Sequence, residues 1–166
     1  MLGEILKGLA TTFKVMLQPP VTTNYPEVKR PVSKRFKGRH ELKRYDDGLE
    51  KCIGCALCAA ACPADAIFVE ASENTDEERY SPGERYASTY EINMLRCIFC
   101  GFCEDACPTE AIVLEQNYEL SFYDRESAIY TKDMLIVPVP TGGRDVPQQV
   151  EAGKFDRAIP DMENPV

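Results

Sequence analysis

The sequence predicts a small α+β fold, and two observations predict it: an internal duplication, and a short β-prone run that closes each copy. Residues 52–70 (CIGCALCAAACPADAIFVE) and 97–115 (CIFCGFCEDACPTEAIVLE) align with ten identities in nineteen positions. A repeat with unchanged cysteine spacing indicates a duplicated structural unit whose copies bind something similar. At 166 residues the chain is one domain by length, with a modest core.

The two runs AIFVE and AIVLE are expected to be short strands. They should pair with strands that enter each cysteine loop, such as YEINMLR. Before each run, Pro63 and Pro108 lack an N–H and restrict the preceding residue, so they end the short turns that deliver Cys62 and Cys107. The centre of the chain is therefore predicted to be a small α+β module.

All eight cysteines lie in residues 52–63 and 97–108. No run of about 18 uncharged apolar residues is present that would span a bilayer. Glu4, Lys7 and Lys14 interrupt the N-terminal stretch that could otherwise be a signal peptide. We therefore expect the chain to stay inside the cell, where dense cysteine clusters are metal ligands more often than disulfides.

Each cysteine segment reads C-x2-C-x2-C-x3-C-P. Three thiolates at this spacing can hold three corners of one 4Fe-4S cube, while the fourth is carried toward the other cube. Two structural zinc sites are the competing interpretation, but zinc usually takes two separated pairs of cysteines and does not need the third. The pattern predicts two 4Fe-4S clusters with exchanged fourth ligands, the first bound by Cys52, Cys55, Cys58 and Cys107, and the second by Cys97, Cys100, Cys103 and Cys62.

Apolar residues beside the cysteines are expected to limit water around the clusters, which helps to set their potential, and they would also serve as ordinary core. His40, the only histidine, receives no role, because a lone histidine is more often a structural hydrogen-bonding residue. No arrangement of residues for hydride transfer, quinone chemistry or proton pumping is visible, and there is no Rossmann glycine fingerprint. We therefore assign no catalytic residue to this chain. The apolar residues are Ile53, Ile98, Phe99 and Phe102.

Residues 1–20 are predicted to form an amphipathic, membrane-proximal helix that Pro19 and Pro20 end. Its alternative role is packing against the core of the same chain, but the linker PPVTTNYPEVKRP favours a helix that lies on a membrane or on a membrane subunit. The polar face carries Glu4, Lys7, Thr11, Lys14 and Gln18. The apolar positions are Leu2, Ile5, Leu6, Leu9, Phe13, Met16 and Leu17.

Residues 21–45 are interpreted as a basic linker and docking segment. Residues 29–44 carry eight basic residues and one acid, a net charge of +7, which leaves −15 for the rest of a chain whose total is −8. This segregation suits anionic lipid headgroups or an acidic partner surface. Nucleic acid is the generic alternative partner of a basic segment, but it is not expected here, because the acidic remainder would repel phosphates.

Residues 46–136 are predicted to be a two-cluster ferredoxin-like domain with an extension. Within them, the acidic residues 71–90 between the repeats are expected to be a solvated connection. A chain shortened to start near Asp46 is expected to assemble both clusters. Residues 137–166 are rich in proline, glycine, glutamine and charge. They are predicted to be an extended or disordered tail, which stays mobile or becomes ordered along a neighbour.

Several segments resemble the two-cluster subunit, called subunit I in bacteria, of the proton-pumping NADH:quinone oxidoreductase, respiratory complex I. The resemblance covers most of residues 1–136, and GRHEL and GERY...YEIN are more specific to that family than the cysteine motifs are. The segments are QPPVTTNYP, RFKGRHELKRYDDGLEKCIGCALCAAACPADAI, GERYASTYEINMLRCIFCGFCEDACPTEAIVLEQNYEL and YDRESAIYTKDML.

The resemblance implies a hetero-oligomeric, peripheral-arm subunit of a translocase. It would bind other peripheral and membrane subunits and pass single electrons toward the last cluster, in a neighbouring subunit beside quinone. The cysteine ligands of that family fall on all eight cysteines here. Two alternatives stay open: an equivalent relay subunit of a ferredoxin-fed or hydrogenase-linked membrane complex, and a free soluble ferredoxin. The short N-terminus without a transit peptide favours a bacterial source, with the chain peripheral on the cytoplasmic side of the cell membrane.

Overall fold

The computed structural model describes residues 2–148, which belong to two compact units divided between Ser33 and Lys34. The first unit contains helix α1 (Leu2–Met16), and none of its residues is buried. The spacing of its apolar residues places Leu6, Leu9 and Phe13 along one shallow apolar hollow. In residues 2–148, no helix has the length and apolar content needed to cross a membrane.

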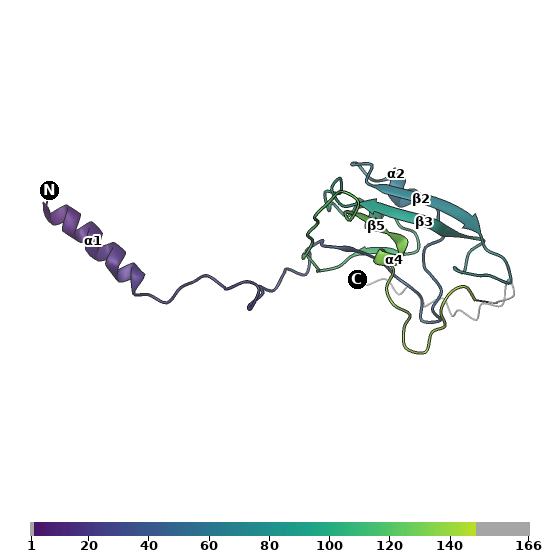
Figure 1. Cartoon of the computed structure of the whole chain (residues 1–166), viewed down its shortest axis with the longest axis horizontal. Coiled ribbons are helices and arrows are strands. Elements are labelled where there is room, and N and C mark those ends of the chain that lie inside the picture. The colour runs from purple at the N-terminus through teal and green to yellow at the C-terminus, as the bar shows by residue number, and fades with distance from the viewer. Residues whose placement is uncertain (1, 149–166) are drawn as a thin grey trace, which may run out of the picture. The chain divides into compact units, whose positions relative to one another are not determined.

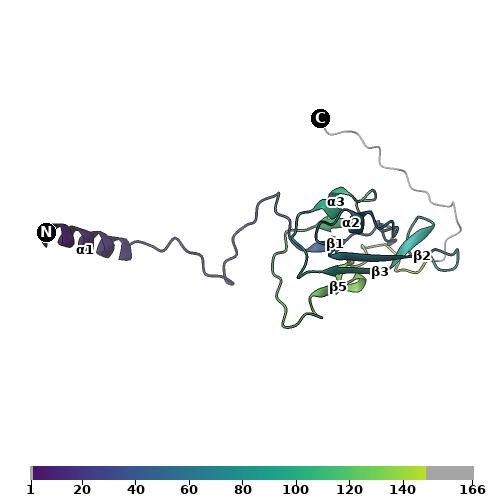
Figure 2. The same cartoon turned by 90° about the horizontal axis from the view of Figure 1, so that it is seen from above.

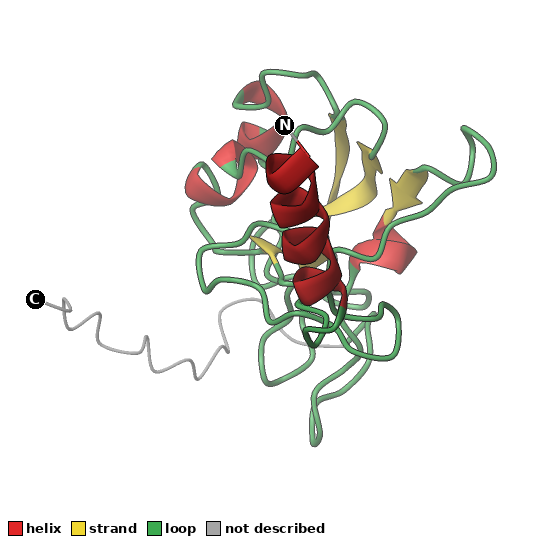
Figure 3. Ribbon diagram, turned by 90° about the vertical axis from the view of Figure 1, so that its left-hand side faces the viewer, coloured by secondary structure: helices red, strands yellow, loops and turns green. Residues whose placement is uncertain are grey.

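The second unit mixes two small antiparallel sheets with short helices (Figures 1 and 2). In one sheet β1 (His40–Leu42) pairs with β4 (Ile112–Leu114). In the other, β3 (Arg85–Asn93) lies between β2 (Ile67–Glu73) and β5 (Ile129–Thr131). The helices are α2 (Leu57–Ala60), α3 (Phe102–Asp105) and α4 (Lys132–Leu135). Loops join these short elements, as Figure 3 shows in green.

The duplication in the sequence is a duplication in the structure. Each cysteine segment is followed by one strand, β2 after the first and β4 after the second, and each strand pairs with one that enters a cysteine loop. Ile67 pairs with Ile92, and its repeat equivalent Ile112 pairs with Leu42. Ile92, Ile112 and Leu42 belong to one core cluster that also contains Cys58 and Cys103, and Ile67 packs against it. Its other members include Tyr90, Leu114 and Leu135. The expected pairing of the AIFVE run with YEINMLR is confirmed.

The compact unit begins earlier than the predicted two-cluster domain. Strand β1 lies within residues 21–45, which the sequence analysis assigned to a basic linker, yet His40 and Leu42 are 1% and 2% exposed. Three residues are too few for a strand pattern to be visible between basic neighbours. A chain that starts near Asp46 would lack β1 and leave Ile112 without its strand partner. We therefore no longer expect that shortened chain to assemble both clusters.

Basic residues of this segment bind the second unit itself. Arg39 donates to the Met134 carbonyl over 2.8 Å, and Arg44 donates to the Val137 carbonyl over 3.1 Å. Lys43 forms ion pairs with Glu41 and Glu115. These contacts occupy charges that the sequence analysis attributed to lipid or partner binding.

The first part of the predicted tail also packs on this unit. The Val137 N–H donates to the Leu42 carbonyl over 2.9 Å, and the Arg144 N–H donates to the Asp47 carbonyl over 3.0 Å. Gln148 exchanges two backbone hydrogen bonds with Arg79 and is 5% exposed. Residues 137–148 are thus part of the compact unit, whereas residues 149–166, the rest of the predicted tail, lie outside the described residues.

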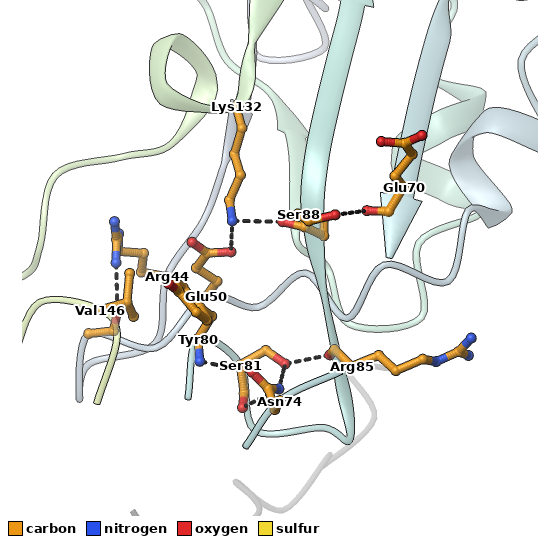
Figure 4. Close-up of polar contacts among 12 residues, drawn as sticks. Arg44, Glu50, Glu70, Asn74, Tyr80, Ser81, Arg85, Ser88, Lys132 and Val146 are labelled. Carbon is orange, nitrogen blue, oxygen red and sulfur yellow. Dashed lines mark hydrogen bonds and ion pairs between the residues drawn. The ribbon is translucent and has the colours of Figure 1, made fainter. Parts of the chain in front are cut away.

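Residues 71–90, expected to be a solvated connection, belong to a β-hairpin whose loop is exposed at residues 75–78 but buries Arg79 and Ser81. The Asn74 amide donates to carbonyl oxygens of Ser81 and Gly83 (Figure 4). Ser81 is fully buried and its hydroxyl donates to the Arg85 carbonyl. This arrangement could not be predicted, because the segment is acidic and lacks apolar periodicity.

A buried ion pair fixes the chain just before the first cysteine segment. Lys132 Nζ lies 2.8 Å from a Glu50 carboxylate oxygen and donates to the Ala87 carbonyl over 2.7 Å (Figure 4). The ammonium also lies over the stacked rings of Tyr80 and Tyr86. Burial raises the pKa of Glu50, although Lys132 opposes that shift. This cluster joins α4, β3 and the loop that leads to Cys52.

Two glycines test how residues 137–148 are held. Gly48 and Gly142 share a φ of +94°, but a Cβ on Gly48 would overlap the Arg144 carbonyl, whereas one on Gly142 meets nothing within 4 Å. We expect Gly142→Ala to cost about 1–2 kcal/mol through backbone strain alone, and Gly48→Ala to cost about 1–3 kcal/mol more through overlap. Anaerobic urea unfolding followed by circular dichroism measures both. Equal losses would contradict the packing of Arg144 on Gly48.

Candidate functional site

The eight cysteines line two cavities in the second unit. Within residues 2–148 no three metal-ligating side chains converge on a point where a single ion would be held; the sulfurs of each set line a cavity wall instead. The first cavity is lined by Cys52, Cys55, Cys58 and Cys107, and the second by Cys62, Cys97, Cys100 and Cys103.

The fourth cysteine of each segment therefore lies with the first three of the other. The cysteine spacing predicts the same two groups as ligand sets, and their binding of clusters stays a prediction. All eight cysteines are free thiols. The two groups are close, because α2 and α3, which carry Cys58 and Cys103, lie against each other (Figure 2). Each segment contributes to both cavities, so neither cavity is complete with one copy of the repeat.

Both cysteine loops follow the same unusual backbone path. Non-glycine residues in the left-handed region cost about 1–2 kcal/mol each, and such strain gathers at functional sites. Each left-handed position in one loop has a counterpart 45 residues later, and a glycine in one copy faces a non-glycine in the other at two of them. The pairs are Gly54 and Phe99 (φ 65° and 53°), Ala56 and Gly101 (58° and 85°), and Asp65 and Glu110 (45° and 50°).

This backbone path determines where the third and the fourth cysteine of each segment lie. Ala56 and Gly101 are the N-caps of α2 and α3, so the helices start at once and bury Cys58 and Cys103. Each helix is four residues long, and its C-cap alanine is followed directly by the fourth cysteine of its segment. A short turn thus separates the third cysteine, in one cavity, from the fourth, in the other.

Backbone N–H groups point at the sulfurs in both copies. The N–H of Ala66 donates to Cys62 Sγ over 3.3 Å, and its repeat equivalent Ala111 donates to Cys107 Sγ over 3.2 Å. The Phe99 N–H donates to Cys97 Sγ over 3.4 Å. Donors placed in this way favour the thiolate over the thiol.

Burial and these hydrogen-bond donors shift the pKa values of the thiols in opposite directions. Burial raises the pKa of Cys52 to about 11 and that of Cys103 to about 12. Burial acts in the same direction on Cys107, but hydrogen bonds from Ile112, Thr109 and Ala111 outweigh it and lower its pKa. Metal ligands must be thiolates, so filling such a site would release protons from the buried thiols.

Two further polar groups reach the sulfurs, and sequence reasoning missed both. The Tyr90 hydroxyl lies 3.3 Å from Cys58 Sγ, and His40 Nε2 lies 3.8 Å from Cys97 Sγ. Burial lowers the pKa of His40 to about 4, so its ring is neutral near pH 7. Burial raises the pKa of Tyr90 well above its ordinary value, so its hydroxyl keeps its proton.

Only some of the four apolar residues that were expected to limit water around the clusters lie at the cavities. Phe99 packs on the core cluster, and Ile53 lines the first cavity. The expectation is wrong for Phe102, which is 53% exposed and lines neither cavity, and only partly right for Ile98, which borders the second cavity but is 64% exposed. The strands supply further apolar lining, with Leu42, Val69 and Ile112 at the first cavity and Ile67 at the second.

Comparison with known proteins agrees with this geometry. Residues 51–112 match the family described as the 4Fe-4S dicluster domain, and they include all eight cysteines. Four thiolates per cavity are the donor set that iron-sulfur clusters use, and the donors to sulfur suit charged ligands. A 4Fe-4S dicluster domain with eight cysteines in two sets of four fits two 4Fe-4S clusters, and this part of the chain is an iron-sulfur electron-transfer domain.

The chain is also similar to a chain in the structure of the membrane-bound sulfane sulfur reductase, an archaeal respiratory membrane complex. The sequences are 29% identical, and the TM-score is 0.48. The match covers 78% of this chain and 60% of that one.

The exchange of the fourth cysteines gives a test that needs no prior assignment of spectra. We expect Cys62→Ser to give the same loss of electron paramagnetic resonance (EPR) signal as Cys100→Ser, because both residues line the second cavity. It should differ from Cys55→Ser, which alters the first cavity, although Cys55 is nearer in sequence. EPR spectra of the three reduced variants are compared under anaerobic conditions. A Cys62→Ser spectrum that matches Cys55→Ser would refute the exchange.

Proposed function

We propose that this chain is the electron-transfer subunit of a membrane-bound, proton-pumping NADH:quinone oxidoreductase. It relays single electrons toward a terminal cluster beside quinone. The observation that carries the relay is the pair of four-cysteine cavities within the matched dicluster domain. The choice of complex rests on the sequence segments that resemble subunit I, above all GRHEL and GERY...YEIN. Catalysis belongs to the whole complex, and no complete active site is proposed on this chain.

The proposed ligands follow the two cavities. When bound, each cluster supplies a group that takes up and releases one electron. The chain provides the thiolates, holds them with the backbone donors of Ala66, Phe99 and Ala111, and limits water with the strand residues of the cavity walls. Cys52, Cys55, Cys58 and Cys107 would hold the first cluster, and Cys97, Cys100, Cys103 and Cys62 the second.

Strand packing supports electron transfer between two fixed sites. The sulfurs of Cys58 and Cys103 belong to the same core cluster as Ile92 and Ile112. Interiors of this kind are close-packed and deform little. A rigid surround keeps the two sites at a fixed separation and in fixed surroundings, which suits one-electron steps between them.

Metal content decides between this function and the zinc interpretation. Two cubes require about eight iron and about eight sulfide per chain. We expect anaerobically purified full chain to carry both, with a reducible species visible by EPR. Iron, zinc and acid-labile sulfide are measured on the same sample. Stoichiometric zinc without labile sulfide would refute the relay.

For the first unit, we propose that α1 docks the chain on a membrane or on a membrane subunit, on the cytoplasmic side of a bacterial cell membrane. Its apolar side chains are exposed, with Leu6 at 58%, Leu9 at 61% and Phe13 at 59%. An amphipathic helix of this kind buries its apolar stripe at an interface. Lys7 and Glu4 form an exposed ion pair on the polar side.

Charges on the apolar stripe test this docking. We expect Leu6→Glu with Leu9→Glu to abolish recovery of the chain in the membrane-bound complex, since the two charges remove most of the stripe's apolar burial. Lys7→Glu is the matched control, because it changes the net charge by the same two units on the polar face. Blots of membrane fractions are read beside cluster spectra.

Normal recovery of the double variant in the complex would refute the docking role. Loss of both clusters in that variant would show that α1 is needed by the cysteine module. Identifying the subunits that co-purify with the unaltered chain, or with Lys7→Glu, distinguishes an NADH-fed complex from a ferredoxin-fed or hydrogenase-linked one. A chain that purifies alone would be a free carrier.

A further inference from the structure

His40 and Tyr90 occupy equivalent places in the two halves of the duplication. In the β2 and β3 pair, Tyr90 lies opposite Val69. In the β1 and β4 pair, His40 lies opposite Leu114, the residue that aligns with Val69 in the repeat. Both side chains are 1% exposed. The fold therefore offers one buried position per half from which a side chain faces a cysteine cavity.

Each of these side chains reaches a sulfur of a different set. The Tyr90 hydroxyl is 3.3 Å from Cys58 Sγ and lines the first cavity. A thiolate ligand can only accept, so the hydroxyl is the donor. An aliphatic residue would fill the core without placing an O–H there.

His40 makes the corresponding approach in the second cavity. Its Nε2 is 3.8 Å from Cys97 Sγ, and its ring lies beside that of Phe99, with 5.6 Å between the ring centres. Among the described residues, Nδ1 is a buried atom without a hydrogen-bond partner. A thiolate ligand can only accept, so a proton on Nε2 gives the sulfur a donor. A ring with its proton on Nδ1 alone would offer the sulfur no donor and would bury an N–H without an acceptor.

We propose that Tyr90 and His40 are positioning residues that set the reduction potentials of the two clusters separately, Tyr90 at the first and His40 at the second. This inference rests on the proposed ligand sets. Reduction adds one electron and no proton, so both donors keep their hydrogens throughout. A donor to a ligand sulfur stabilises the more negative, reduced site, and hydrogen bonds to sulfur are among the factors that set cluster potentials. Removing either donor disfavours reduction of its own cluster.

The two donors are unlike, so they also make the two sites unlike. An O–H at 3.3 Å and an imidazole Nε2 at 3.8 Å differ in donor and in distance. The backbone donors, in contrast, are matched between the copies at Ala66 and Ala111. A nearly symmetric protein scaffold thus gains an asymmetry at this pair of positions. The Thr109 hydroxyl, 3.6 Å from Cys107 Sγ, adds a second one, because its repeat equivalent is Ala64.

The test is a redox titration of the full chain, reconstituted anaerobically with iron and sulfide and followed by EPR with dithionite as the one-electron donor. We expect Tyr90→Phe to make one of the two one-electron waves more negative, by about threefold to tenfold in the reduction equilibrium constant, which is about 28 to 59 mV. His40→Leu should move the other wave, and the double variant both. If the waves overlap in the unaltered chain, Tyr90→Phe should split them.

Tyr130→Phe is the matched control, because Tyr130 is buried in the neighbouring strand but lines neither cysteine cavity. It should leave both waves in place. His40→Gln keeps a side-chain N–H donor and should restore much of the reduction potential lost in His40→Leu. If His40 had only a structural role, this restoration would not be expected. Should His40→Leu fail to fold, Tyr90→Phe and His40→Gln carry the test.

Unmoved waves in Tyr90→Phe with full iron and sulfide would overturn the inference and leave the proposed function standing. So would a shift of the same wave by both variants, or an equal shift in Tyr130→Phe. Absence of iron and sulfide from the unaltered chain would instead overturn the proposed function itself.

Discussion

The exchange of the fourth cysteine between the two segments is the constraint on which the rest of the second unit depends. Cys107 lies with the first segment's thiols and Cys62 with the second's, so each cavity needs both copies. The exchange brings α2 and α3 together and places Cys58 and Cys103 in one core cluster. The cavities are therefore built into the core, and the strands that follow and precede the segments become their walls.

That constraint explains the strain and the donors around the sulfurs. Left-handed backbone recurs at the same positions of both loops, including at Ala56 and Phe99, where glycine is absent. The left-handed residues start α2 and α3 directly after the turn, so that one helix of four residues separates the third cysteine from the fourth. The path also leaves the N–H groups of Ala66 and Ala111 directed at sulfur. The backbone strain and the placement of the cysteine sulfurs thus result from the same backbone path.

The features that depend on local spacing could be predicted from the sequence. Cysteine spacing predicts which thiols share a cavity, and the repeat predicts strand β2 and its partner. Features set by long-range register could not be predicted. β1 is three residues long, and the equivalence of His40 and Tyr90 exists only through pairing with Leu114 and Val69. Residues 137–148 lack apolar periodicity, and backbone hydrogen bonds to Leu42, Asp47 and Arg79 hold them.

We propose that two four-cysteine sets, each drawn from both segments, hold two 4Fe-4S clusters. Anomalous diffraction at the iron edge, from anaerobically grown crystals of the full chain, tests this without any assignment of spectra. We expect two four-iron clusters, with Cys107 bound to the cluster of Cys52 and Cys62 bound to the cluster of Cys97. Iron bound by the four cysteines of a single segment, or isolated single ions in the two cavities, would contradict it.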